Sequence, residues 1–359
     1  RELDARALWQ KVLELRLQTG EPYLIFSDHV NKAMPAHQRE LGLKVRQSNL
    51  CSEIMLHTGK DHLGVERTAV CCLSSVNAET FLEWRDEPRF IEDVMRFLDN
   101  VLEDFIQRAP VDAKAAVYAA KRERSVGLGL MGFHSFLQAQ NVPFESALAK
   151  SWNMRLFKHL RREADKASVK LAEEKGPCPD AADRGVMERF SHKLAIAPTA
   201  SISIICGGAS AGIEPIPANI YSHKTLSGTF AVKNPYLERL LEQKGQNTAA
   251  TWDSILANEG SVQHLDCLSQ DEKDVYKTAF ELDQRWIVEL AADRTPEICQ
   301  AQSINHMLHW QAWERGVKSL YYLRSKSIQR AAHAGADTAE TVEMGSGART
   351  DYEECLACQ

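Results

Sequence analysis

The chain has 359 residues, 44% of them hydrophobic, so it is long enough to bury one large core or two ordinary ones. Its formal net charge of −6 gives no reason to expect a nucleic-acid-binding surface. It contains no apolar run of about 18 residues, so no membrane-spanning helix is expected. The 9 cysteines are scattered and odd in number, which is unlike a secreted disulfide scaffold and favours a reducing cytoplasm.

Apolar residues spaced three and four apart predict helices at 4–19, 85–108, 145–174 and 271–293. Short apolar runs suit buried strands at 194–197, 201–205 and 320–323. Helices that alternate with such strands indicate an α/β fold with parallel pairing. Large apolar residues almost disappear after about residue 334, so we expect a folded part over 1–333 and a flexible tail over 334–359.

Asn49, Cys51 and Glu53 are three polar residues at a spacing of two. In an extended segment alternate residues share a face, so all three side chains would point at one ligand. A thiyl radical at Cys51 could abstract hydrogen from a substrate carbon, with Glu53 as general base on a neighbouring hydroxyl and Asn49 bonded to the same oxygen. The alternative is a buried structural cysteine between surface polar residues.

Cys71 and Cys72 supply a second candidate redox sulfur. Adjacent cysteines rarely form a disulfide with each other, so the partner of Cys71 would lie elsewhere in the protein. The alternative is a small apolar residue in a buried strand.

The segment Gly127–Gly132 has the spelling of a dinucleotide-binding fingerprint, Gly-x-Gly-x-x-Gly. The residues before it do not form a buried strand, and no acidic residue follows at the required distance. We therefore expect these glycines to serve helix packing.

Residues 197–203 and 206–215 are rich in small residues and hydroxyls. Such a loop can place backbone N–H groups and Ser or Thr hydroxyls around a phosphate, especially where a helix begins. An ordinary tight connection is the alternative, and the loop is not a Walker P-loop because no Gly-Lys-Ser/Thr follows.

His306 and His309 lie three residues apart on a predicted helix, which could suggest a metal. The chain contains no Glu-x-x-His, and Cys355-x-x-Cys358 has no second pair for a structural zinc. A solvated or partner-facing helix is the preferred interpretation, so any metal is expected on another polypeptide.

Tyr321 and Tyr322 are adjacent tyrosines, and Cys355 and Cys358 form a pair of thiols near the end of the sequence. A phenol can carry an unpaired electron because it loses its proton as it is oxidised. Neighbours on a regular strand face opposite sides, so both rings lie on one transfer line only if the backbone bends. Together with Cys51, these features favour reduction of a substrate by a protein thiyl radical.

These segments resemble the large, catalytic subunit of class I ribonucleotide reductase over about residues 1–330 and the tail. The resemblance depends on the order and wording of five motifs: Ser-Asn-Leu-Cys-Ser-Glu-Ile at 48–54, Cys-Cys-Leu-Ser-Ser-Val-Asn at 71–77, Ala-Pro-Thr-Ala-Ser at 197–201, Gly-Ile-Glu-Pro at 212–215 and Leu-Tyr-Tyr-Leu-Arg at 320–324. It implies the C-terminal half of a ten-stranded α/β barrel with helical additions and a flexible tail.

The resemblance also implies roles for individual residues. Cys51 would carry the thiyl radical on a finger loop, with Asn49 and Glu53 at the substrate 3′-hydroxyl. Cys71 would be one of the two thiols that reduce the 2′ position and become a disulfide. The diphosphate of a ribonucleoside diphosphate would be bound by Pro198, Thr199, Ala200, Ser201 and Ile202.

The radical would enter at Tyr322 and pass to Tyr321 and then to Cys51. It would come from a small subunit that holds a dimetal-tyrosyl or related radical cofactor, since none is expected in this chain. Cys355 and Cys358 would re-reduce the active-site disulfide and be recharged by thioredoxin or glutaredoxin.

The family's catalytic subunit is about twice as long, and the chain starts without Met inside a predicted helix. We therefore expect a C-terminal part, either a split-gene product or an excised piece, that needs a separate N-terminal half and forms homo-oligomers. Three alternatives stay open: an adenosylcobalamin-dependent reductase, which does not need the tyrosine pair; a non-catalytic fragment that docks the small subunit; and a generic thiol oxidoreductase, disfavoured because no Cys-x-x-Cys lies at a strand–helix junction.

Overall fold

The structure is a computed structural model that describes residues 3–225, 228–305 and 308–323. Its α-helices are α1 (Ala5–Thr19), α2 (Ser27–Ala33), α3 (Ala36–Glu40), α4 (Phe81–Trp84), α5 (Phe90–Arg108), α6 (Lys114–Glu123), α7 (Phe133–Ala139), α8 (Ala147–Lys175), α9 (Pro179–Ala182), α10 (Ala200–Ile205), α11 (Pro235–Gln243), α12 (Ala249–Ala257), α13 (Gln270–Val275), α14 (Gln284–Arg294) and α15 (His309–Glu314). The strands are β1 (Leu24–Ile25), β2 (Gly59–Lys60), β3 (Glu66–Arg67), β4 (Leu73–Asn77), β5 (Gly127–Met131), β6 (Ile220–Thr225), β7 (Gly228–Lys233) and β8 (Ser319–Leu320). Short 3₁₀ turns are η1 (Ala78–Thr80), η2 (Val111–Ala113) and η3 (Thr295–Glu297).

Three of the four predicted helices are confirmed as α1, α5 and α8. The Asp4 side chain caps α1 by accepting from two backbone N–H groups, and Gly20 ends it in the left-handed region. Ser146 caps α8 in the same way. Apolar faces of α5 and α8 pack into the main core, so burial adds to local capping in fixing these helices.

The predicted helix over 271–293 is wrong, because this stretch contains two helices that serve different cores. Val275 of α13 packs into a small cluster, whereas Ile287 of α14 packs into the main core. Asp283 starts α14 as its N-cap, and its own N–H is held by Glu145. Periodicity alone cannot detect a break at which both flanking helices stay amphipathic.

The centre of the main core is a set of parallel segments, which confirms the predicted α/β pairing. Strands β4 and β5 pair in parallel from Leu73↔Gly127 to Asn77↔Met131. Single parallel bridges extend this arrangement through Leu128↔Leu194 and Ile196↔Gln302. The predicted strand at 194–197 therefore lies next to β5, and all five residues of β5 are buried.

The expectation that Gly127–Gly132 serves helix packing is wrong for the first two glycines, because Gly127 and Gly129 lie in strand β5, while Gly132 follows the strand as the N-cap of α7. A Cβ atom on Gly129 would lie 2.6 Å from the Ala195 carbonyl oxygen, closer than real side chains allow. The glycines therefore permit close approach of neighbouring strands inside the sheet.

The predicted strand at 201–205 is also wrong, because these residues form helix α10. Thr199 turns the chain with a φ of 57°, and Ser203 N–H donates to the Thr199 carbonyl at 3.0 Å. The isoleucines do not enter a sheet, and Ile205 is 83% exposed. The alternation of Ser and Ile resembles a strand pattern, but these residues form a helix instead.

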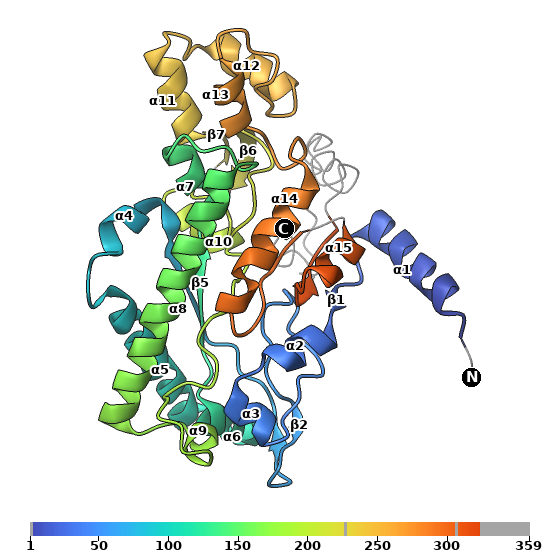
Figure 1. Cartoon of the computed structure of the whole chain (residues 1–359). Helices are drawn as coiled ribbons and strands as arrows, with labels where there is room; N and C mark the ends of the chain where they lie inside the picture. Colours follow the sequence, from blue (N-terminus) through green and yellow to red (C-terminus); the bar gives the residue numbers. More distant parts are fainter. Residues whose placement is uncertain (1–2, 226–227, 306–307, 324–359) are drawn as a thin grey trace, which may run out of the picture.

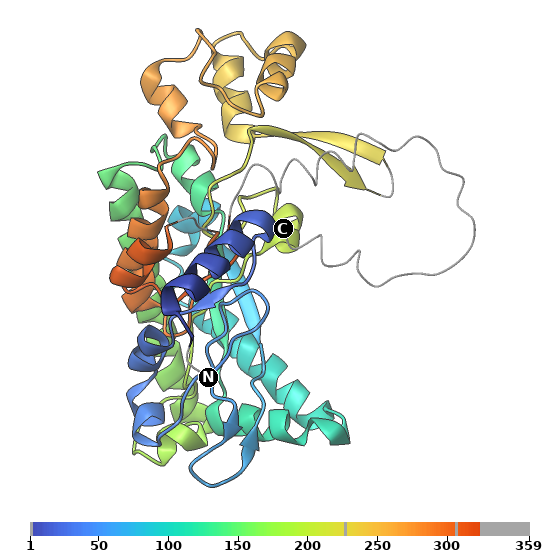
Figure 2. The same ribbon diagram turned by 90° about the vertical axis from the view of Figure 1, so that its right-hand side faces the viewer.

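A smaller helical unit stands at one end of the molecule, beside the long β6–β7 hairpin (Figure 1). Its helices α11, α12 and α13 share a separate core that includes Leu237, Trp252 and Tyr276. The second view shows the hairpin extending away from the main body (Figure 2). This unit was not anticipated from the sequence.

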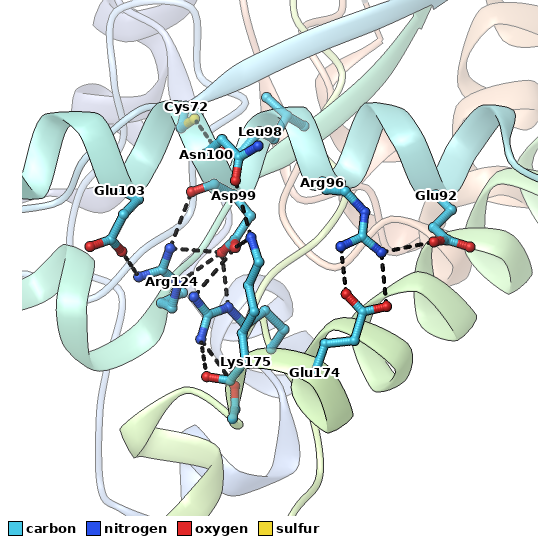
Figure 3. Close-up of polar contacts among 12 residues, drawn as sticks. Cys72, Glu92, Arg96, Leu98, Asp99, Asn100, Glu103, Arg124, Glu174 and Lys175 are labelled. Carbon is cyan, nitrogen blue, oxygen red and sulfur yellow. Dashed lines mark hydrogen bonds and ion pairs between the residues drawn. The ribbon is translucent and has the colours of Figure 1, made fainter.

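Ion pairs centred on a buried aspartate join helix α5 to α8 and to the segment that follows α6 (Figure 3). Asp99 of α5 is 1% exposed and accepts hydrogen bonds from Arg124 at 2.7 Å, Arg189 at 2.9 Å and Lys175 at 2.9 Å. Burial alone would raise the pKa of Asp99, but these three cations outweigh it and lower the pKa below its usual value. The carboxylate therefore ties α5 to the end of α8 through Lys175 and to the segments after α6 and α9 through Arg124 and Arg189.

Within the described part of the chain, no helix combines the length and apolarity needed to cross a membrane. The predicted tail over 334–359, with Cys355 and Cys358, lies outside the described residues, as does His306.

Candidate active site

Asn49, Cys51 and Glu53 do not lie in an extended segment as expected; they form a tight turn. Ser52 has a φ of 61°, and its N–H donates to the Asn49 carbonyl at 3.2 Å. The Asn49 side-chain oxygen accepts from the N–H groups of Glu53 at 3.2 Å and Ile54 at 3.1 Å. The three side chains are therefore brought together by a loop that Asn49 itself organises, and a left-handed residue beside Cys51 is typical of a functional site.

Glu53 is a buried carboxyl group without an arginine or lysine among the groups that set its pKa. It is 2% exposed, and burial raises its pKa, while hydrogen bonds from Asn49 and Ser303 oppose the shift only in part. The Ser303 hydroxyl donates to Glu53 Oε2 at 3.3 Å and also to the Cys51 carbonyl. A carboxylate in such a site is a stronger base than one in water.

Cys71 lies close enough to Cys51 and Glu53 for their charges to act on it. The residue is exposed overall, yet its thiol is desolvated, and this desolvation together with the Glu53 carboxylate raises its pKa to about 11. Cys72 points the other way: it is buried in the main core, and its thiol donates to the Leu98 carbonyl. The structure thus places Cys71, and not Cys72, with the candidate site.

Tyr321 and Tyr322 lie side by side, because the regular strand ends before them and does not force them onto opposite faces. Strand β8 ends at Leu320, and the two ring centroids are 4.3 Å apart at an angle of 56°. Tyr321 is 2% exposed, and its pKa is raised by burial and by the neighbouring Cys51 and Tyr322. The Tyr321 hydroxyl has no hydrogen-bond partner among the described residues, so Cys51 and Tyr322 influence its pKa as close neighbours. Cys51, Tyr321 and Tyr322 therefore follow one another in space.

Segment 300–305, which lies outside the five motifs, joins these parts. Ala301 N–H donates to the Glu53 carbonyl at 3.0 Å, and Ser303 N–H donates to the Ile196 carbonyl at 2.9 Å. Tyr321 N–H then donates to the Ile304 carbonyl at 2.9 Å. The sequence of this segment, Gln-Ala-Gln-Ser-Ile-Asn, is too polar to indicate a buried strand, because its amide and hydroxyl groups form hydrogen bonds with neighbouring loops.

The loop predicted to bind phosphate lies at the start of α10. Thr199 is buried, and its hydroxyl oxygen accepts from Gly212 N–H at 2.7 Å, so this side chain ties the loop to the Gly-Ile-Glu-Pro motif. A Cβ on Gly212 would lie 3.0 Å from the Ala197 carbonyl oxygen, which explains glycine there. Pro198 and Ala200 are half-buried, whereas Ser201 and Ile202 are exposed. The loop adjoins Ser303 through Ile196.

His309 lies on the buried side of the helix that was expected to be solvated or partner-facing, whereas its neighbour Trp310 is 65% exposed. His309 is 7% exposed, accepts from Arg16 Nε at 2.7 Å and packs edge-on against Trp9. Within residues 3–225, 228–305 and 308–323, no cluster of three or more His, Cys, Asp or Glu side chains is arranged to hold a metal.

Comparison with known proteins agrees with this geometry. The family model described as the ribonucleotide reductase barrel domain matches residues 1–187 and 180–323. The large subunit of ribonucleoside-diphosphate reductase from Invertebrate iridescent virus 3 is 43% identical, over 91% of this chain and 53% of that protein. The corresponding protein of Caenorhabditis elegans is 30% identical, over 99% of this chain and 50% of that protein.

A solved structure, the alpha subunit of the class Id ribonucleotide reductase of Actinobacillus ureae, matches with a TM-score of 0.81 and 38% identity. The match covers 88% of this chain and 60% of that one. The chain thus spans about half the length of the curated relatives it matches. The predicted α/β class is confirmed, and the chain belongs to the ribonucleotide reductase barrel-domain family.

Proposed function

We propose that this chain is the C-terminal part of the catalytic subunit of a class I ribonucleoside-diphosphate reductase. The observation that carries the proposal is the spatial order Tyr322, Tyr321, Cys51, with Glu53 and Cys71 around the same thiol. The tyrosine pair and the class I structural neighbour support this function over the adenosylcobalamin-dependent alternative.

In the proposed reaction, Tyr322 receives the radical from the small subunit, Tyr321 passes it on, and Cys51 becomes the thiyl radical. The thiyl sulfur abstracts the hydrogen atom at the 3′ carbon of the ribose. Glu53 takes the proton of the 3′-hydroxyl, for which its raised pKa suits it, and the amide group of Asn49 bonds the same oxygen. Two thiols, one of them Cys71, then become a disulfide: they give two electrons, one of their protons leaves with the 2′-hydroxyl as water, and the other hydrogen forms the new C–H bond at the 2′ carbon. Finally Glu53 returns the proton to the 3′ oxygen and the Cys51 thiol returns its hydrogen atom to the 3′ carbon, which regenerates the thiyl radical.

The remaining roles follow the family resemblance. We assign the substrate diphosphate to the loop at Pro198–Ile202, next to Ser303 and hence to Glu53. Cys355 and Cys358 would reduce the active-site disulfide and be recharged by thioredoxin or glutaredoxin in the cytoplasm. The second thiol of the reducing pair would come from a separate N-terminal half, and the dimetal-tyrosyl or related radical cofactor from the small subunit.

The test is formation of deoxyribonucleoside diphosphates by two preparations, each assayed with and without adenosylcobalamin. The chain with the small subunit alone should be inactive, and addition of the complementary half should restore turnover. Turnover without that half would overturn the assignment of the second thiol. No turnover with every component, but tight binding of the small subunit, would identify a docking fragment, and activity that depends on adenosylcobalamin would identify the other class.

A further inference from the structure

A third tyrosine, Tyr23, completes a cluster with the radical-transfer pair. Its ring centroid lies 4.7 Å from that of Tyr321 and 4.9 Å from that of Tyr322. The Tyr322 ring meets it edge-on, at 86°. Tyr23 lies outside the five family motifs and almost 300 positions from Tyr321 in the sequence.

Strand pairing explains why Tyr23 stands there. Strands β1 and β8 are antiparallel with Leu24 opposite Leu320, so the same register places Tyr23 opposite Tyr321. Arg16 strengthens the junction, because its guanidinium donates to the Pro22 carbonyl and, at 2.9 Å, to the Tyr321 carbonyl. The contact is therefore built into the fold on both sides.

The hydroxyl of Tyr23 links the cluster to solvent. It donates to Glu21 Oε1 at 3.2 Å, and Glu21 is exposed. Burial, followed by hydrogen bonding with Tyr322 and the charge of Glu21, raises the pKa of Tyr23. The Tyr322 ring thus packs against the Tyr23 ring, and the Tyr23 hydroxyl bonds the Glu21 carboxylate, so the three groups follow one another from a half-buried phenol to the surface.

Oxidation of a tyrosine requires an acceptor for its proton, and these groups can supply one. A phenol that loses an electron must also lose its proton, and the buried guanidinium of Arg16 nearby disfavours any further positive charge. Tyr321 can give its proton and electron together to Tyr322, since both then move between the same two rings. Tyr322 gives its electron to another subunit, so its proton needs a separate acceptor.

We propose that Tyr23 carries the proton of Tyr322 to Glu21 when the radical enters the chain. The electron of Tyr322 goes to the radical of the small subunit, which is reduced. The Tyr322 proton passes to the Tyr23 oxygen, while the Tyr23 proton passes to Glu21 Oε1. Tyr322 is left as a neutral radical, and the same transfers run backwards when the electron returns after turnover.

This inference rests on the proposed function, and the experiment separates the two. Single-turnover formation of deoxynucleotide is measured in H₂O and D₂O with the full complex of this chain, its complementary half and the small subunit. Tyr23→Phe keeps the ring and removes the hydroxyl, and Glu21→Gln removes the acceptor without touching the rings. The matched control is Tyr236→Phe, which breaks a similar bond from Tyr236 to Glu79 at 2.5 Å in the other core.

Both test variants should slow the reaction by about 10–100-fold and change the solvent isotope effect, whereas the control should match the unaltered protein. Tyr23→Phe equal to the control in both solvents would overturn the proposal. A slow Tyr23→Phe with an unaffected Glu21→Gln would also overturn it, because packing alone would then explain the loss. If instead Tyr322→Phe turns over normally, the radical route of the proposed function fails.

Discussion

Two buried polar regions of this molecule differ in how their charges are balanced. At Asp99, one carboxylate is surrounded by Arg124, Arg189 and Lys175 (Figure 3). Near Cys51, in contrast, the Glu53 carboxyl group is buried beside the amide of Asn49 and the hydroxyl of Ser303. The buried guanidinium of Arg16 contacts carbonyls and His309, and burial lowers its pKa to about 10.

The difference shows which buried groups are built for stability and which for proton chemistry. Three cations keep the pKa of Asp99 low, so its charge is fixed and it acts as a tie between helices. Glu53, Cys71 and Tyr321 have raised pKa values because little opposite charge faces them. Groups whose pKa is raised in this way can accept or give protons as a reaction proceeds.

The largest effect is expected from the tyrosine pair. Tyr321→Phe or Tyr322→Phe keeps the stacked rings but removes the hydroxyl that is oxidised, so turnover should be lost. Binding of the ribonucleoside diphosphate should change little, because neither ring belongs to the proposed diphosphate loop. Steady-state assays with equilibrium binding would show this, and retained turnover in either variant would exclude the route.

Glu53→Gln tests the chemical side of the comparison. Loss of a general base should lower turnover by about 10²–10⁴-fold. Since the base acts as carboxylate and its pKa is raised, activity of the unaltered enzyme should fall on acidification at a higher pH than for an ordinary glutamate. A pH–rate profile measures this, and an unchanged acid limb in Glu53→Gln would remove Glu53 from the role.

Asp99→Asn tests the structural side. Removal of the carboxylate leaves three cations without their shared partner, and breaking a buried pair in this way costs about 3–5 kcal/mol. Urea unfolding should show the loss, and Asp93→Asn on the exposed face of α5, where Asp93 pairs with Arg89, is the matched control with a change of less than about 1 kcal/mol. Equal effects of the two variants would contradict the difference.

Much of the candidate site could be predicted because the residue types and their order identify a motif whatever its local backbone conformation is. The motifs place Asn49, Cys51, Glu53 and Cys71 at one candidate site, and the four residues lie close together, although the extended geometry assumed for the first three was wrong. Asn49 folds the loop back by accepting two N–H groups, and no alternation pattern contains that information.

The remainder depends on contacts between distant segments. Tyr23 meets Tyr321 through strand pairing, and Ser303 meets Glu53 through segment 300–305, whose polar spelling does not resemble a strand. The prediction of one helix over 271–293 was wrong for the same reason, since the two halves of this stretch pack into different cores. Local periodicity predicts an element but not the partner it will find.

The smallest expected effect concerns Glu123, a carboxyl group outside the candidate active site whose pKa is nevertheless raised by burial. It is fully buried at the end of α6, where burial raises its pKa to about 7 and Gln38 donates to it at 3.0 Å. The folded state therefore favours the protonated carboxyl. Its stabilising contribution is complete below the usual carboxyl pKa of 4.5 and is lost as the pH rises through about 7.

Glu123→Gln keeps the shape and removes the titration, so the variant should be more stable than the unaltered chain at pH 8, by at most about 3 kcal/mol, and similar to it at pH 4. Urea unfolding across this range measures the difference. Glu103→Gln is the opposite control: the Arg124 partner lowers the pKa of Glu103, so its contribution is lost on acidification. If Glu123→Gln destabilises the protein equally at both pH values, then Glu123 is a charged structural partner like Asp99, and raised pKa values do not distinguish the two regions.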